Sequence, residues 1–362
     1  MEKIIDIKKL LKNVVAYKAS DLHLVSRSEP QIRVDGKLVS LKLPKLDGET
    51  IKNMCYSIIT KKQKEIFEEY KELDFAIEIS NIGRFRVNYY KTLNDVAAAF
   101  RVISTKIPSI DELDMPKFYK DLIKQEKGLI LVTGPTGSGK STTLASILNE
   151  INLTERKHII TIEDPVEFIH ENRQSLFSHR NVGTDTDSFD SALKHALRED
   201  PDIIFIGEMR DKKTISAALT AAETGHLVFS TLHTNSAVCT INRIIDVFSA
   251  DEQSQIRTQL SMSLVAVISQ VLIPKIGGGR VVASEILIKN FAIANLIREG
   301  KIHQIYNQMQ LGQGATKMQT QTQALVQLVK KGIIKKDDAL RFSTRLDELA
   351  KSLSAINGKN MI

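Results

Sequence analysis

The chain has 362 residues, a net charge of +7 and a hydrophobic content of 42%, as in an ordinary globular protein. This length exceeds the size at which one hydrophobic core usually stops growing, so we expect two domains. The two cysteines, Cys55 and Cys239, are too few for a disulfide framework and lack the spacing of a zinc site. The composition therefore excludes a disulfide-stabilised secreted domain and favours a reducing cytosol.

Two segments bear on membrane targeting. Residues 1–10 lack the long apolar core of a signal peptide. Residues 260–273 form the most apolar stretch, but serines and a glutamine interrupt it and it is too short to span a bilayer. We expect a cytoplasmic protein with only peripheral membrane contact. The basic charge raises nucleic acid as a partner, but short lysine groups are typical of solvated helix faces, so we expect no specific nucleic acid.

Residues 1–105 are predicted to form a small α+β domain. Residues 4–17 have helical spacing, and residues 32–39 alternate around an Asp35-Gly36 turn, which predicts a hairpin. A helix is predicted over 50–70, and strands over 83–90 and 96–102.

Prolines at 108 and 116 favour a linker over 106–116. After it, short apolar runs at 128–133, 158–162, 203–207 and 227–231 alternate with helical segments. This pattern predicts an α/β domain over 117–290 with a parallel sheet wound by crossovers. Residues 291–353 are predicted to be helical, and residues 354–362 to form a loose polar tail.

A glycine-rich loop lies between an apolar run and a helix-compatible segment, the context that a P-loop requires. It consists of Gly134, Pro135, Thr136, Gly137, Ser138, Gly139, Lys140, Ser141 and Thr142. Its glycines let backbone N–H groups surround the β- and γ-phosphates, and the helix start adds its positive dipole end. Lys140 would neutralise phosphate charge and Ser141 would ligate Mg²⁺, with Thr142 as a spare hydroxyl. We therefore expect ATP and Mg²⁺ as cofactors; the alternative is a glycine-rich turn without a ligand.

Three further strand ends carry polar residues. Residues 161–168 contain the adjacent carboxylates Glu163 and Asp164, and residues 202–211 contain Glu208. A carboxylate at such a position can orient the attacking water or hold the water shell of magnesium. Residues 226–234 form a third strand with His226 and His233 at its ends, and His233 is a candidate sensor of the γ-phosphate. Capping acids and structural histidines are the alternative reading.

The order and the amino-acid sequences of these segments resemble those of the secretion ATPases of the type II/type IV pilus superfamily, and within it those of the PilT-type retraction motors. Further matching strings lie at 19–24, 32–36, 196–202, 221–226 and 276–280. The resemblance implies a RecA-like P-loop ATPase domain after a PAS-like α+β domain. It also implies that Glu163 and Asp164 form an Asp box, that Glu208 is the catalytic glutamate, and that His226 and His233 form a His box. Ser141, Glu163, Asp164 and Glu208 would then surround the magnesium ion.

The resemblance further implies a homo-hexameric ring. Arg86 and Arg101 match arginines that reach nucleotide phosphates across a subunit boundary; pairing with surface acids is their alternative. The implied partners are an inner-membrane pilus platform protein of the PilC type and a second pilus ATPase, at the inner face of the cytoplasmic membrane. The implied function is retraction of a type IV pilus, and thus twitching motility.

Two departures from the family pattern keep alternatives open. Asn94-Asp95 stands where an arginine and a glycine are usual, and Ala294 replaces the first arginine of the retraction signature at 292–299. Neither change affects ATP hydrolysis. An accessory or regulatory ATP-binding subunit and a nucleic-acid translocase are the other hypotheses, although no basic segment interleaved with aromatic residues supports the translocase.

Overall fold

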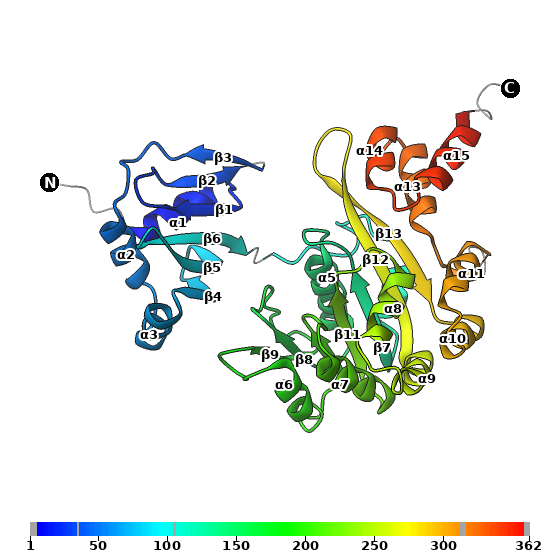
Figure 1. Ribbon diagram of the computed structural model, residues 1–362. Helices are drawn as coiled ribbons and strands as arrows, with labels where there is room; N and C mark the ends of the chain where they lie inside the picture. Colours follow the sequence, from blue (N-terminus) through cyan, green and yellow to red (C-terminus); the bar gives the residue numbers. More distant parts are fainter. Residues whose placement is uncertain (1–5, 35, 104–105, 117, 312–315, 358–362) are drawn as a thin grey trace. The chain divides into compact units, whose positions relative to one another are not determined.

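The computed structural model describes residues 6–34, 36–103, 106–116, 118–311 and 316–357. The chain divides into two compact units, one of residues 1–106 with 165–169 and one of residues 107–164 with 170–362 (Figure 1). Each unit is built around its own sheet. The fold class predicted from the sequence is confirmed, with a small α+β unit followed by a larger α/β unit.

The first unit is a six-stranded sheet in the order β3-β2-β1-β6-β5-β4, in which all neighbours are antiparallel. Its strands are β1 (Asp21–Leu24), β2 (Gln31–Val34), β3 (Lys37–Ser40), β4 (Glu72–Ile79), β5 (Gly83–Thr92) and β6 (Asp95–Ile103). Its helices are α1 (Ile7–Ala16), α2 (Gly48–Tyr56) and α3 (Lys61–Tyr70). The predicted hairpin is confirmed as β2 and β3, with Asp35 of its turn outside the described residues.

Residues 50–70 are helical as predicted, except for a break at 57–60. The segment forms α2 and α3, because Thr60 caps a new helix and Gln63 completes a capping box with it. Strand β4 was missed. The strands predicted over 83–90 and 96–102 are confirmed as parts of β5 and β6.

One face of this sheet carries the core of the first unit. Tyr89 is fully buried, and its ring makes edge contacts with Phe67, Phe75 and Phe100 at centroid distances of 5.2–6.0 Å. Its hydroxyl donates to the Cys55 carbonyl at 3.0 Å, which satisfies this buried polar group. Because side chains alternate along a strand, the neighbours of these residues lie on the opposite face.

The second unit contains a seven-stranded sheet in the order β13-β12-β7-β11-β10-β8-β9. All neighbours are parallel except β12 and β13, which form an antiparallel edge. The strands are β7 (Gly128–Thr133), β8 (His158–Glu163), β9 (Leu176–Asn181), β10 (Ile203–Ile206), β11 (Leu227–Leu232), β12 (Leu264–Pro274) and β13 (Arg280–Ile288). The four strands predicted from the apolar runs are confirmed as β7, β8, β10 and β11.

Helices cover both faces of this sheet. They are α4 (Phe118–Leu122), α5 (Lys140–Thr154), α6 (Phe189–Ala196), α7 (Lys212–Glu223), α8 (Ala237–Asp246), α9 (Gln253–Ser263) and α10 (Phe291–Arg298). On β7, Ile130 and Val132 pack with α4 and α5, whereas Leu129 and Leu131 pack with α6 to α10. The strand is therefore buried on both sides, which explains its unbroken apolar run.

The C-terminal region is helical, as predicted. It contains η1 (Ile302–Gln304), α11 (Ile305–Leu311), α13 (Gln321–Lys330), α14 (Lys336–Phe342) and α15 (Leu346–Asn357). The loose tail predicted from 354 is wrong for residues 354–357, which complete α15, and residues 358–362 lie outside the described residues. The apolar stretch 260–273 is the end of α9 and most of β12. Within the described ranges, no helix combines the length and apolar character needed to cross a membrane.

Candidate nucleotide site

The glycine-rich loop joins β7 to α5, as the P-loop prediction requires. Gly139 precedes the helix with a φ of 87°, a left-handed conformation that suits glycine. No side chain caps the start of α5. The N–H groups of its first turn therefore remain directed at the loop, where the positive end of the helix dipole favours an anion.

Gly134 is the position where the loop depends most on glycine. Its φ is 146°, and a Cβ atom there would lie 2.3 Å from the Gln270 carbonyl oxygen and 2.6 Å from Ser138 Oγ. The buried Gln270 side chain of β12 also donates to the Ser138 carbonyl at 2.7 Å and accepts from Thr143 Oγ1 at 3.0 Å. Strand β12 thus fixes the shape of the loop. We did not identify Gln270 as a site residue, although its polar side chain within an apolar strand was a signal.

The loop contains an unsatisfied hydroxyl. Ser138 Oγ is buried and has no hydrogen-bond partner among the described residues. A buried hydroxyl without a partner is costly unless a ligand completes it. The helix start without a side-chain cap, the closely packed glycine at position 134 and this hydroxyl together fit the phosphates of a nucleotide.

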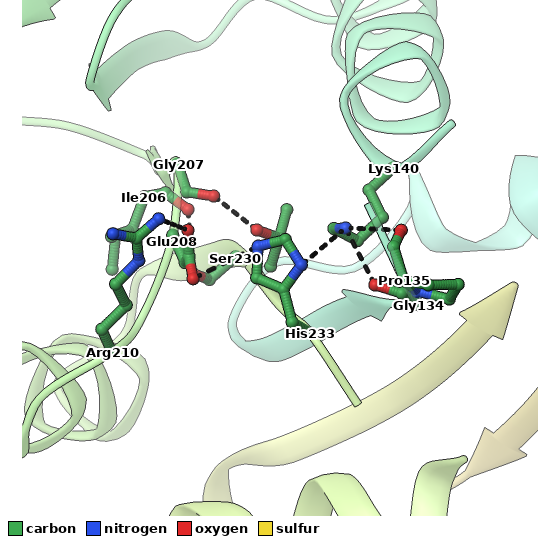
Figure 2. A network of polar contacts seen from close by, with 10 residues as sticks. Gly134, Pro135, Lys140, Ile206, Gly207, Glu208, Arg210, Ser230 and His233 are labelled. Atoms are coloured by element: carbon green, nitrogen blue, oxygen red, sulfur yellow. Dashed lines mark hydrogen bonds and ion pairs between the residues drawn. The ribbon is translucent and has the colours of Figure 1, made fainter. Parts of the chain in front are cut away.

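Lys140 lies within the loop that it helps to form (Figure 2). Its Nζ donates to the carbonyl oxygens of Gly134 at 2.9 Å and Pro135 at 3.2 Å, and lies 3.4 Å from His233 Nδ1. An ammonium group has only donors, so Nδ1 accepts and the imidazole proton is assigned to Nε2. The lysine and the histidine are therefore neighbours in one polar chain.

Glu208 continues this chain from the end of β10. Its Oε1 lies 3.3 Å from His233 Nε2, and its Oε2 accepts from Arg210 at 2.7 Å. Burial raises the pKa of Glu208, but the hydrogen bond from Arg210, assisted by His233, outweighs burial and holds that pKa below its usual value. The carboxylate is thus ionised at neutral pH. Arg210 is a second residue that we did not identify as part of the site.

The neighbouring strand ends fix the position of Glu208. Ser230 Oγ donates to the Ile206 carbonyl at 2.8 Å, and Thr231 Oγ1 donates to the Gly207 carbonyl at 2.6 Å. A Cβ atom on Gly207 would lie 3.3 Å from Glu163 Cα, so β8 and β10 end in close contact. The carboxyl ends of β7, β8, β10 and β11 therefore bring together the P-loop, Glu163, Glu208 and His233.

The predicted magnesium ligands are Ser141, Glu163, Asp164 and Glu208. Glu163 is buried at the end of β8, and Ser141 is half-buried in the first turn of α5. No group of three or more histidine, cysteine or acidic side chains in the described part of the chain could hold a metal by itself. Magnesium in a nucleotide site keeps most of its waters and shares phosphate oxygens, so this donor set fits it.

His226 lies apart from this constellation. It precedes β11, at the end opposite to His233, and its Nδ1 is 3.1 Å from the Ala221 carbonyl. The whole of β11 separates the two histidines, so they lie at opposite edges of the sheet. His226 therefore has the surroundings of a structural histidine.

Arg86 and Arg101 belong to the first unit, and each pairs with an acid of that unit. Arg101 Nε donates to Asp21 at 2.9 Å, and Arg86 Nε lies 4.0 Å from Asp74. Both arginine side chains stay partly exposed. Arg86 thus lies near a surface acid, as in the alternative that the sequence left open, whereas the acid that pairs with Arg101 is buried. The role of both arginines toward a nucleotide stays a prediction.

A ring cluster supports the segment after Glu163. The His170 ring stacks on Phe177 at a centroid distance of 4.4 Å, and the backbone N–H of His170 donates to His179 Nε2 at 3.2 Å. His179 Nδ1 in turn contacts Thr161 of β8 at 2.9 Å. His170 Nδ1 is buried without a partner among the described residues, and burial lowers the pKa of this histidine to about 3. The imidazole is therefore neutral.

Comparisons with known proteins agree with this geometry. The model of the family "Type II/IV secretion system protein" matches residues 1–279. The chain is 51% identical to the type IV pilus retraction ATPase PilT of Pseudomonas aeruginosa, over 92% of this chain and 97% of that protein. It is 50% identical to a twitching motility protein of Neisseria gonorrhoeae, over 86% of this chain and 83% of that protein.

A solved structure is similar over nearly the whole chain. The crystal structure of the pilus retraction motor PilT with bound ADP matches with a TM-score of 0.90 and 47% identity, covering 96% of this chain and 99% of that one.

Proposed function

This chain belongs to the Type II/IV secretion system protein family, and from that membership we infer that it is a PilT-type motor that hydrolyses ATP to power retraction of a type IV pilus. The observation that carries this function is the polar chain from Lys140 through His233 to Glu208. It joins the phosphate-binding loop to the acid that faces the reacting water.

ATP binding is assigned to the loop and the first turn of α5. Lys140 exchanges its bonds to the loop carbonyls for phosphate oxygens, and Ser138 Oγ donates the bond that it lacks within the protein. Ser141 would ligate Mg²⁺ with its hydroxyl, and Glu163, Asp164 and Glu208 would hold the waters of the ion. The bound ion would neutralise charge on the phosphates.

Hydrolysis is assigned to Glu208. Its ionised carboxylate, held by Arg210 on one oxygen, orients the attacking water or accepts a proton from it. His233 connects Glu208 to Lys140, so any shift of the lysine toward the γ-phosphate alters the contact of the histidine with the glutamate. In this way the acid responds to the presence of the γ-phosphate.

The assembly is part of the proposal. The chain forms a hexameric ring in which Arg86 and Arg101 of one subunit reach the nucleotide of its neighbour. The linker at 106–116 is the hinge, and the ring works beneath an inner-membrane platform protein of the PilC type, together with a second pilus ATPase. What supports this is the placement of both arginines on a unit separate from the P-loop.

Deleting the gene and counting surface pili tests the function. Excess pili and lost twitching are expected, and a plasmid copy of the wild-type gene should reverse both, whereas a copy with Lys140→Ala should not. Bald cells would indicate an extension motor. Unchanged pilus numbers, or rescue by the Lys140→Ala copy, would indicate a subunit whose own ATP hydrolysis is not needed.

A further inference from the structure

The outer face of the first unit carries a row of charged residues. In the sheet register Asp21 lies directly opposite both Arg33 of β2 and Arg101 of β6, and Arg101 lies opposite Arg86 of β5. Directly opposite residues point to the same face. The alternate positions Leu22 and Phe100 are buried in the core, so the row lies on the face away from it.

Asp21 is the centre of this row, and its two oxygens have different partners. Oδ2 accepts from Ser20 Oγ at 2.7 Å and lies 3.8 Å from Arg33 Nε. Oδ1 accepts from Arg101 Nε at 2.9 Å. The residue is only 6% exposed, and burial raises its pKa, but the hydrogen bonds from Ser20 and Arg101 outweigh burial and hold the pKa below its usual value. A fixed, ionised carboxylate thus presents one oxygen to Arg101.

Arg101 is held at one atom only. Asp21 is its only side-chain partner among the described residues, and the bond uses Nε. The Arg101 side chain is 68% exposed, so both terminal NH₂ groups are accessible. These two groups form the planar fork that matches two oxygens of a phosphate.

Folding gives little reason for this pair. Compared with apolar side chains of similar volume, a buried carboxylate beside guanidinium groups adds little net stability. Arg86, directly opposite Arg101, repels it, and without a holding group an exposed arginine samples many rotamers. What Asp21 supplies is one orientation.

We infer that Asp21 is a positioning residue for Arg101, which it holds by Nε so that the terminal NH₂ pair is presented to a nucleotide phosphate of the neighbouring subunit. Ser20 and Arg33 are the groups that fix Asp21. The inference rests on the proposed role of Arg101 across the subunit boundary. It gives the motif at residues 19–24 a part in catalysis, through Ser20 and Asp21. A transition state that binds a prearranged arginine loses less entropy than one that must order it.

Asp21→Asn in the assembled full-length protein is the first test. Asparagine leaves one acceptor oxygen for two sets of donors, so either Arg101 or the Ser20 side loses its partner. Turnover should fall about tenfold, within the range that misplacement of a catalytic group costs, while the KM for ATP changes less than twofold. Asp21→Glu keeps the charge but displaces it, and should not restore turnover.

A double-mutant cycle separates positioning from stability. Asp21→Asn combined with Arg101→Ala should be no slower than Arg101→Ala alone, because a positioning residue has nothing left to position. Glu68→Gln is the matched control: Glu68 accepts from Tyr56 and pairs with Lys91 in the same unit, away from this row. It should leave turnover unchanged, even where it lowers the melting temperature.

The outcomes are distinguishable. If Arg101→Ala turns over like the wild type, the proposed role of Arg101 fails. If Arg101→Ala is slow but Asp21→Asn is not, or if their effects multiply, the positioning role is overturned while the proposed function stands. Should Asp21→Asn not assemble, Ser20→Ala replaces it: it should slow the wild type severalfold and leave the Arg101→Ala background unchanged, and equal slowing in both would refute the inference.

Discussion

In the nucleotide site and in the charged row of the first unit, a carboxylate holds an arginine, but the two pairs are brought together differently. Glu208 binds Arg210, two residues further along the same loop, at 2.7 Å. Asp21 binds Arg101 at 2.9 Å across two paired strands, although the two residues are 80 positions apart in sequence. Local chain geometry sets the first pair, whereas sheet register sets the second. The contact between Asp21 and Arg101 depends on the alignment of two strands, so it is the more easily displaced of the two.

Loss of the acid in the nucleotide site should give the largest effect. Glu208→Gln keeps the shape of the side chain but removes its charge, and turnover should fall about a hundredfold, within the usual contribution of a general base. ATP affinity measured by calorimetry should remain. Glu171→Gln is the matched control, since Glu171 accepts from Arg173 at the same spacing and the same 2.7 Å on the surface. Near-wild-type turnover of Glu208→Gln would remove this acid from the mechanism.

The arginine of the first unit should have the next largest effect, and we expect that effect on the site of another subunit. Arg101→Ala should lower turnover about tenfold or more, with less effect on affinity. This is below the roughly hundredfold to thousandfold that loss of one enclosed charge-stabilising donor costs, because the Arg101 side chain is exposed. Mixing it with Lys140→Ala subunits should recover activity, because some boundaries then pair an intact loop with an intact arginine. Absence of recovery at every ratio, with subunit exchange verified, would place Arg101 outside the neighbouring site.

His170 contrasts with both acids, since it is buried without a charged partner. Its pKa is about 3 in the folded chain but near 6.5 when unfolded, so the unfolded state binds the extra proton between these values. Stability should therefore fall as the pH drops below 6.5, with a slope that approaches about 1.4 kcal/mol per pH unit near pH 5.5. Denaturant unfolding between pH 5 and 6.5, where the acids with lowered pKa stay ionised, measures this slope.

His170→Phe should remove that slope and keep the stack on Phe177. His195→Gln is the control, because His195 is exposed on α6 and should leave the slope unchanged. A slope that persists in His170→Phe would assign the proton uptake to another group.

The smallest effect is expected outside both regions. Ala294 lies in the middle of α10, half-buried, and Ala294→Arg restores the residue usual in retraction motors. Turnover of the purified protein should change less than twofold, below about 0.4 kcal/mol in barrier, while twitching or pilus number changes clearly. A large change in turnover would mean that α10 takes part in the catalytic cycle.

The sequence predicted the parts of the site that lie in continuous segments. Residues 134–142 and the strands around them could be read directly, because a P-loop depends on local backbone conformation and on neighbouring side chains. Buried parallel strands were equally clear from their apolar runs. Lys140, Glu208 and His233 were identified in this way, and the structure places them in one polar chain.

Other features were decided only by tertiary structure. The polar residue Gln270 contacts the loop because β12 pairs with β7. His226 lies apart because the length of β11 separates it from His233. The break at Thr60 differs from these features, because the capping box of Thr60 and Gln63 is a local signal that the sequence itself contains. The pairing of Asp21 with Arg101 followed from strand register, which no local pattern specifies. Neighbouring residues thus determine local conformation, whereas contacts across a sheet depend on how distant strands align.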